Sequence, residues 1–307
     1  MNTTTFPRLL AAGHELDTAP ASFGELRSSI DLIEDTGALR ERMAEDGYLY
    51  LRGYLDREEV IAARQVIMER LAEQGALDPA FPCLDGVARA GANTSFQPDL
   101  AAHNAPLHRV LYAGRMMEFY ENFLGGAVRH FDFTWLRAVS PGKGTALHCD
   151  IVFMGRGTPN LCTAWTPLGD VSYELGGLMI LENSHQNERL RAGYGSKDVD
   201  TYCSNRRAEA PKGLGGGGTI KAGGALTNNP ATLRERLGGR WLSTEFRMGD
   251  LLTFGMYTIH ASLDNQSNRI RCSSDSRYQL ASEPADERWI GPNPIGHGPN
   301  AKRGLIC

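Results

Sequence analysis

Three features of the 307-residue sequence predict a mainly β protein with flanking helices, folded as a double-stranded β-helix, the jelly-roll or cupin-like barrel. Short runs that alternate between apolar and polar residues are separated by glycine-containing turns, and amphipathic segments with helical spacing come early in the chain. The candidate metal ligands stand more than a hundred residues apart. A barrel of this type brings distant strands together, so such ligands can meet on its inner surface.

Helices are expected over residues 36–46, 56–73 and 105–124, where apolar residues recur at helical spacing. Asp56 is a suitable N-cap for the second of these helices, because its side chain can accept from the free amides of the first turn. Residues 78–104 are expected to be a loop. The expected strands lie at residues 48–52, 130–139, 160–168, 176–181, 241–248, 251–260 and 269–280.

The chain is expected to hold one catalytic domain over residues 36–290, preceded by an irregular N-terminal arm at residues 1–35 and followed by a C-terminal tail at residues 291–307. Residues 186–240 interrupt the strand pattern and are expected to act as a lid or insertion loop. Their four successive glycines, Gly215–Gly218, lack the Gly-Lys-Ser/Thr ending of a phosphate-binding loop. A loop that shapes substrate specificity therefore explains this segment better than a phosphate site.

The composition argues against nucleic-acid and membrane partners. A formal net charge of −4 and a pI near 6.1 give no basic surface for nucleic acid, and no apolar run approaches the roughly 20 residues needed to span a bilayer. The six cysteines have no CxxC spacing, so neither a zinc ribbon nor a disulfide framework is indicated. With no long apolar stretch near Met1, these features predict a cytoplasmic protein whose partner is a small-molecule substrate; they do not predict the oligomeric state.

The most informative short pattern is His148-Cys149-Asp150, which follows a glycine-rich turn at Pro141–Gly144. In an extended strand, residues two apart point to the same face, so His148 and Asp150 can converge on one metal ion. His260, at the end of a later strand, is the expected third ligand. Two histidines and one carboxylate on one face of a metal leave the opposite positions open, as non-haem Fe(II) oxygenases require.

Arg271 follows His260 by eleven residues and can donate two parallel hydrogen bonds to a carboxylate. Arg269 competes for this role, because residues two apart on a strand share a face and the alternation does not separate them. A His-x-Asp triplet alone is common by chance, so the distal histidine and the arginine are what make the pattern specific.

With these residues in place, the sequence resembles the phytanoyl-CoA dioxygenase family, whose iron- and 2-oxoglutarate-dependent members carry a His-x-Asp motif, a distal histidine and an arginine eleven residues after it. The resemblance spans roughly residues 36–290 and includes three further stretches. These are Asp46–Leu55, Trp165–Asp170 and Gly176–Ile180. At Asn183-Ser184-His185 the sequence departs from the family's frequent Gly-Ser-His.

The resemblance implies the same fold, with His148, Asp150 and His260 holding Fe(II) and Arg271 holding the distal carboxylate of 2-oxoglutarate. It implies a reaction with O2 in which 2-oxoglutarate gives succinate and CO2 while an unactivated C–H bond of a small organic molecule is hydroxylated. Desaturation, epimerisation and ring formation begin with the same hydrogen abstraction and stay open.

Three softer expectations concern 2-oxoglutarate contacts. Thr145 and Thr163 match positions that touch the cosubstrate in family members, and a hydroxyl suits a carboxylate oxygen. Trp165 matches a recurrent aromatic residue, although a core tryptophan explains it equally well. Ser262 is expected to share the inward face of His260.

Three other readings compete with the oxygenase. A halogenase of this family would need the carboxylate ligand to be absent, and Asp150 is present. A zinc hydrolase could use the same three ligands but would leave Arg271 unexplained. A cupin-like binding or sensor protein without turnover would keep the barrel, and the intact ligand set disfavours it.

Overall fold

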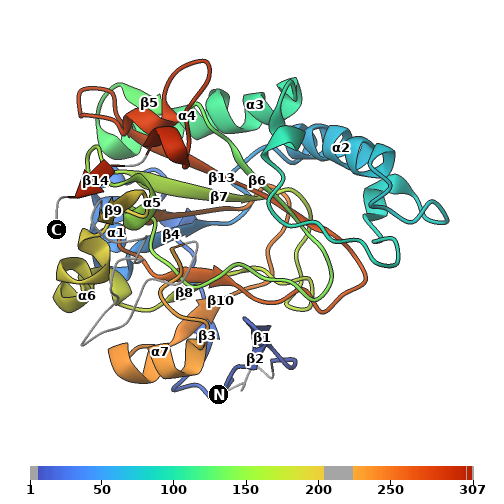
Figure 1. Cartoon of the computed structure of the whole chain (residues 1–307), viewed down its shortest axis with the longest axis horizontal. Coiled ribbons are helices and arrows are strands. Elements are labelled where there is room, and N and C mark those ends of the chain that lie inside the picture. The colour runs from blue at the N-terminus through green and yellow to red at the C-terminus, as the bar shows by residue number, and fades with distance from the viewer. Residues whose placement is uncertain (1–5, 204–223, 302, 306–307) are drawn as a thin grey trace.

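The structure, a computed structural model, describes residues 6–203, 224–301 and 303–305 of the chain. Two β-sheets lie face to face, and helices cover the outer face of the larger one (Figure 1). The larger sheet has the order β4 (Tyr48–Leu51), β11 (Leu251–Gly255), β7 (Cys162–Pro167), β13 (Arg271–Leu280) and β5 (Val128–His130), with β6 (Trp135–Val139) also paired to β13. The smaller sheet has the order β12 (His260–Ser262), β8 (Leu178–Leu181), β10 (Trp241–Ser243) and β3 (Phe23–Glu25).

This arrangement confirms the predicted fold class: a mainly β, jelly-roll protein with flanking helices. The strands form two facing sheets without closing into a continuous barrel in the described ranges. The cross-strand register shows which side chains point between the sheets. Phe254 lies opposite Thr163, and Thr163 lies opposite Arg277. One row of inward side chains therefore runs from an apolar core position to two polar residues of the site.

Apolar residues of both sheets fill the space between them. Tyr48, Tyr50, Trp165, Leu252 and Phe254 come from the larger sheet, and Leu178, Ile180 and Leu242 come from the smaller one. All are less than 5% exposed. This core occupies one end of the space between the sheets and leaves the other end to polar residues of β13 and to the metal-binding turn.

Helices α1 (Thr36–Asp46), α2 (Arg57–Glu73), α3 (Ala105–Tyr112) and α4 (Gly114–Leu124) pack against the outer face of the larger sheet (Figure 1). The predictions for α1 and α2 are confirmed, and Asp35 and Asp56 cap them by accepting from first-turn amides. The single helix predicted over 105–124 is wrong. Ala113 is extended (φ −147°) and Gly114 has φ +49°, which ends α3 and lets α4 start in a new direction.

Three of the predicted strands differ from the prediction by more than their ends. The run 130–139 contributes β5 and β6, separated by residues 131–134, and the run 241–248 is a strand only over β10. The run 251–260 divides into β11 and β12, which belong to different sheets. Residues 256–259 carry the chain across, where the Thr258 hydroxyl donates to the carbonyl of Gly47. The alternation of apolar and polar residues continues where the chain crosses between the sheets, so the sequence pattern does not show that two strands are present.

The segment before residue 36, expected to be an irregular arm, is more ordered than that. β1 (Leu10–Ala11) pairs with β2 (His14–Glu15), and β3 joins the smaller sheet parallel to β10. The carboxylate of Asp264, just after β12, accepts from the amides of Ala12 and Gly13. The arm is thereby tied to the strand that carries His260.

Residues 186–240 contain α6 (Glu188–Ala192), β9 (Thr201–Cys203) and α7 (Pro230–Leu237), while Gly215–Gly218 lie outside the described residues. The C-terminal part of the chain packs against the rest of the domain. β14 (Arg303–Leu305) pairs with β9, and Trp289 is only 2% exposed. The short helix α5 is Ile151–Met154, and the 3-10 helices are Ile30–Leu32, Cys83–Asp85, Pro98–Ala101, Ser184–Gln186, Tyr194–Ser196, Glu287–Trp289 and Pro299–Ala301.

Candidate metal centre

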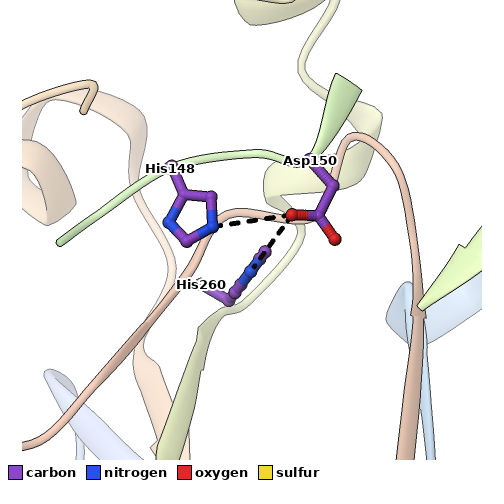
Figure 2. Close-up of side chains that lie close together, drawn as sticks. All are labelled: His148, Asp150 and His260. Carbon is purple, nitrogen blue, oxygen red and sulfur yellow. Dashed lines mark ion pairs between the residues drawn. The ribbon is translucent and has the colours of Figure 1, made fainter. Parts of the chain in front are cut away.

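His148, Asp150 and His260 come together in the structure, and all three are buried. Nε2 of His148 lies 3.5 Å and Nε2 of His260 lies 3.7 Å from Oδ1 of Asp150 (Figure 2). One ligand atom from each residue lies within 4.8 Å of the others. The three side chains thus surround a point that a single metal ion could occupy.

The backbone explains why the three residues meet. His148 and His260 exchange two backbone hydrogen bonds, of 3.1 and 3.0 Å, so the turn adds a residue pair to the edge of the smaller sheet beside β12. The expectation that Asp150 also lies in an extended strand is wrong. Its backbone is helical (φ −68°, ψ −25°) and it starts α5, which turns its carboxylate back toward the two imidazoles.

Each imidazole is oriented by a backbone carbonyl. Nδ1 of His148 is 2.7 Å from the carbonyl oxygen of Ala146, and Nδ1 of His260 is 3.0 Å from that of Thr258. A carbonyl only accepts, so each Nδ1 carries the proton and each Nε2 keeps its lone pair for a metal. Burial, followed by the neighbouring His148, lowers the pKa of His260 to about 4, which keeps this ligand neutral at pH 7.

The carboxylate of Asp150 has one oxygen for the metal and one for the protein. Its Oδ2 accepts from the Thr163 hydroxyl at 2.5 Å and from Nη2 of Arg277 at 3.0 Å. Burial alone would raise the pKa of Asp150, but the charge of Arg277, joined at low pH by that of protonated His260, outweighs it and holds the pKa well below its usual value. Oδ1 remains free, so the Asp150 carboxylate can bind a metal through this single oxygen.

Arg277 was not predicted from the sequence. It lies six residues after Arg271 on β13, on the same face, and its guanidinium carbon is 4.4 Å from the centre of the Trp135 ring. The alternation of Arg271, Ser273, Asp275 and Arg277 was the available signal. Only the cross-strand register shows that this face looks into the site.

The structure separates the two candidate arginines of the cosubstrate site. Arg269 is exposed and precedes β13, whereas Arg271 is the first residue of β13 and is 1% exposed. Nη1 of Arg271 donates to the Ser273 hydroxyl at 2.9 Å, and its Nε and Nη2 have no partner among the described residues. Burial lowers the pKa of Arg271 to about 10, so the guanidinium is still charged at pH 7.

Other buried donors on the inward face also lack partners within the described ranges. They are Nε and Nη1 of Arg277 and Nε1 of Trp165. Buried N–H groups are normally satisfied, so a set of unpaired donors around two guanidinium groups fits a bound anion rich in acceptor oxygens. A dicarboxylate such as 2-oxoglutarate has this chemistry.

The remaining predicted residues lie around the same space. The amide of Thr145 donates to the Ser262 hydroxyl at 2.7 Å, and Thr145 lines a cavity beside the metal ligands. Thr163 contacts the Asp150 carboxylate, as described above. Trp165 packs between the sheets against Phe246, with ring centres 4.7 Å apart.

A cavity of about 590 Å³ opens beside the triad, with His148, Asp150 and Arg277 in its wall. Most of the remaining wall is apolar and comes from Phe96, Phe133, Trp135, Phe153, Met154, Trp289, Pro294 and Ile295. Phe96 comes from the expected loop 78–104 and Ala225 from the expected specificity loop 186–240. Residues 294–297 of the C-terminal segment line it as well, which the sequence did not predict.

Comparison with known proteins agrees with this geometry. The model of the phytanoyl-CoA dioxygenase family matches residues 43–273, which include all three ligands and Arg271. The chain belongs to this family. Two relatives named 1-deoxypentalenic acid 11-beta-hydroxylase, from Streptomyces exfoliatus and Streptomyces arenae, are 29% and 27% identical to it. The alignments cover 90% and 93% of this chain and 92% and 95% of the relatives.

Solved structures share the fold of this dioxygenase-family chain. The epimerase SnoN in complex with Fe3+, alpha ketoglutarate and nogalamycin RO has a TM-score of 0.55 at 19% identity, covering 86% of this chain and 94% of SnoN. EctD from S. alaskensis with 2-oxoglutarate and 5-hydroxyectoine has a TM-score of 0.56 at 17% identity, covering 94% of this chain and 87% of EctD.

Family and ligand set together identify an Fe(II)- and 2-oxoglutarate-dependent oxygenase of the hydroxylase type, which uses O2. None of the described helices is both long enough and apolar enough to cross a membrane.

Proposed function

We propose that this hydroxylase acts on a compact, largely apolar small molecule, with His148, Asp150 and His260 holding Fe(II) and Arg271 holding the distal carboxylate of 2-oxoglutarate. The observation that carries the proposal is the meeting of three buried ligands, two of which, His148 and Asp150, lie in the wall of a mostly apolar cavity. Two imidazoles and one carboxylate suit Fe(II) and leave coordination positions for cosubstrate and O2. Bound iron, 2-oxoglutarate and O2 supply the oxidation of an unactivated C–H bond, which side chains alone cannot perform.

The protein's own residues prepare the centre. Thr163 and Arg277 occupy Oδ2 of Asp150, which leaves Oδ1 as the oxygen that would hold the metal. The carbonyls that accept from both Nδ1 atoms keep the imidazoles in the metal-binding tautomer. Arg271, with unpaired buried donors, is suited to fork onto a carboxylate. Thr145 and the unpaired Nε1 of Trp165 are further candidates to contact 2-oxoglutarate.

The cavity supports the substrate class. A volume of about 590 Å³ lies within the range of ~300–1,000 Å³ for small-molecule sites. Its aromatic walls exclude water from a reacting C–H bond and favour a carbon skeleton over a strongly polar molecule. The two Streptomyces relatives are named for hydroxylation of 1-deoxypentalenic acid, which supports a compact organic acid or a related molecule here.

The decisive experiment is an anaerobic titration of the purified protein with Fe(II) and 2-oxoglutarate. We expect a weak visible metal-to-ligand charge-transfer band, and we expect Asp150→Ala to lose or alter it. Admitting O2 should then release succinate. Tight zinc binding without a band would favour the hydrolase alternative, and ligand binding without succinate release would favour a non-catalytic binding protein.

A cytoplasmic location remains part of the proposal. Cys83, Cys149, Cys162 and Cys272, all in the described ranges, are unpaired, which supports a reducing compartment. The proposed partner is a small-molecule substrate rather than nucleic acid or a membrane.

A further inference from the structure

His297 lies in the cavity wall, far along the chain from the metal ligands. Its ring packs edge-on against Trp289, with centres 4.7 Å apart at 82°, and against Phe153 at 5.7 Å. Phe153 also contacts the ring of the metal ligand His148, with centres 5.3 Å apart. One aromatic ring therefore separates His297 from the metal centre along this wall.

A buried ionic cluster holds the imidazole in place. Nδ1 of His297 is 2.7 Å from Oδ2 of Asp200, and the same oxygen accepts from Nη1 of Arg288 at 2.7 Å. Arg288 is completely buried and also pairs with Asp286 at 2.5 Å and Asp198 at 3.2 Å. Such a network fixes both the position and the orientation of the ring, because each member has several partners.

The cluster is joined to the metal-binding turn as well. Arg156, two residues beyond α5, donates to Asp198 at 2.5 Å and to the carbonyl of Ala301 at 2.6 Å. Its amide donates to Asp286 at 3.1 Å. The C-terminal segment is thus anchored on the element that begins with Asp150, so His297 has a defined position relative to the metal.

The Asp200 contact determines which nitrogen of His297 faces the cavity. Burial alone would raise the pKa of Asp200, but the bonds from His297 and Arg288 outweigh it and hold the pKa below its usual value. An ionised carboxylate only accepts, so Nδ1 carries the proton. Nε2 makes no hydrogen bond within the described part of the chain, and the side chain is 34% exposed.

The surroundings of Nε2 make it a distinctive feature of the cavity. Phe153 and Ile295 line the same wall, and the nitrogen atoms of Arg277 and Trp289 that are unpaired within the described ranges are donors, whereas Nε2 of His297 is an acceptor. Arg137 pairs with Asp275 at 3.0 Å, and Thr145 bonds Ser262. Single polar atoms in an otherwise apolar pocket are what fix the orientation of a bound molecule.

We propose that Nε2 of His297 accepts a hydrogen bond from a hydroxyl group of the substrate and thereby determines which carbon is presented to the metal. The inference rests on the proposed function, because it uses the same cavity. His297 is in this view a specificity-determining residue that touches the substrate and does not take part in the oxidation.

The test uses rigid apolar cages that differ in one group: 1-adamantanol, adamantane-1-carboxylate and 1-methyladamantane. Their dissociation constants are measured anaerobically on the protein loaded with Fe(II) and 2-oxoglutarate, from the shift of the charge-transfer band. We expect 1-adamantanol to bind about 10-fold more tightly than 1-methyladamantane, as one hydrogen bond provides. Adamantane-1-carboxylate is the control, because an ionised carboxylate has no donor for Nε2 and should not depend on His297.

Three variants distinguish the role of Nε2 from that of the rest of the His297 side chain. His297→Phe keeps the ring packing, and His297→Asn can keep the bond to Asp200, but neither has a polar atom at the Nε2 position. His297→Gln places an amide there. We expect His297→Phe and His297→Asn to abolish the preference for 1-adamantanol over 1-methyladamantane, and His297→Gln to retain part of it. The charge-transfer band shows whether the loaded metal centre is intact in each variant.

Equal binding of 1-adamantanol and 1-methyladamantane to the wild type, binding of neither, or a preference for 1-adamantanol that survives in His297→Phe would each overturn the inference. Failure of the proposed function has a different signature, because the wild-type protein would then form no charge-transfer band with Fe(II) and 2-oxoglutarate.

Discussion

Replacing Arg271 with methionine should make the protein more stable in the absence of 2-oxoglutarate. Burial lowers the pKa of Arg271 from 12.5 to about 10, which corresponds to roughly 3 kcal/mol against its charged form at pH 7. Its Nε and Nη2 are buried without partners. Methionine fills a similar volume without charge or donors, and the variant loses one hydrogen bond, to Ser273, of about 1 kcal/mol. The expected net gain is therefore about 2 kcal/mol.

The same substitution should remove the response to 2-oxoglutarate. A buried carboxylate without its guanidinium partner costs about 3–5 kcal/mol, so affinity should fall by roughly 100-fold or more. The assay is urea unfolding at pH 7, without and with Fe(II) and 2-oxoglutarate under anaerobic conditions. We expect the ligands to raise the unfolding midpoint of the wild type and to leave that of Arg271→Met nearly unchanged.

Arg269→Met is the matched control, because Arg269 is two residues away and exposed. It should alter neither the stability nor the response to 2-oxoglutarate by more than about 0.5 kcal/mol. If Arg271→Met were less stable than the wild type without ligand, Arg271 would be a satisfied structural residue. If it still responded fully to 2-oxoglutarate, the distal carboxylate would bind elsewhere.

Three further substitutions test the supports of the site by urea unfolding of the metal-free protein. Arg277→Met leaves Asp150 without its buried partner and should lower the free energy of unfolding by about 3–5 kcal/mol. An unchanged unfolding midpoint would show that Arg277 does not stabilise that carboxylate. Arg288→Met leaves Asp286 and Asp200 unpaired and should cost a similar amount; a cost below about 1 kcal/mol would contradict the clustered anchor. Gly176→Ala should lower the free energy of unfolding by about 2 kcal/mol or more, because Gly176 has φ +85° and a Cβ would lie 2.5 Å from the carbonyl oxygen of Leu263. An unchanged unfolding midpoint would mean that the backbone of this turn shifts to accept the alanine.

The sequence was enough to predict the fold class and the three side chains that meet in the structure, because much of this pattern is short-range. His148 and Asp150 are two residues apart, Arg271 stands at a fixed spacing from His260, and the helix caps at Asp35 and Asp56 act on amides two or three residues away. Local chemistry of this kind needs no knowledge of which strands are neighbours.

Tertiary structure decided what depends on burial and on crossings between sheets. Arg269 and Arg271 are equivalent by alternation, and only the start of β13 at Arg271 buries one and exposes the other. Arg277 became a partner of Asp150 through the pairing of β13 with β7. The return of residues 294–297 to the cavity depends on a buried ion pair between segments about ninety residues apart and on a hydrogen bond between segments more than a hundred residues apart. Such contacts form because a buried charge is costly unless it is paired, and its partner can come from a distant part of the chain. No periodicity in the sequence indicates which residue that partner is.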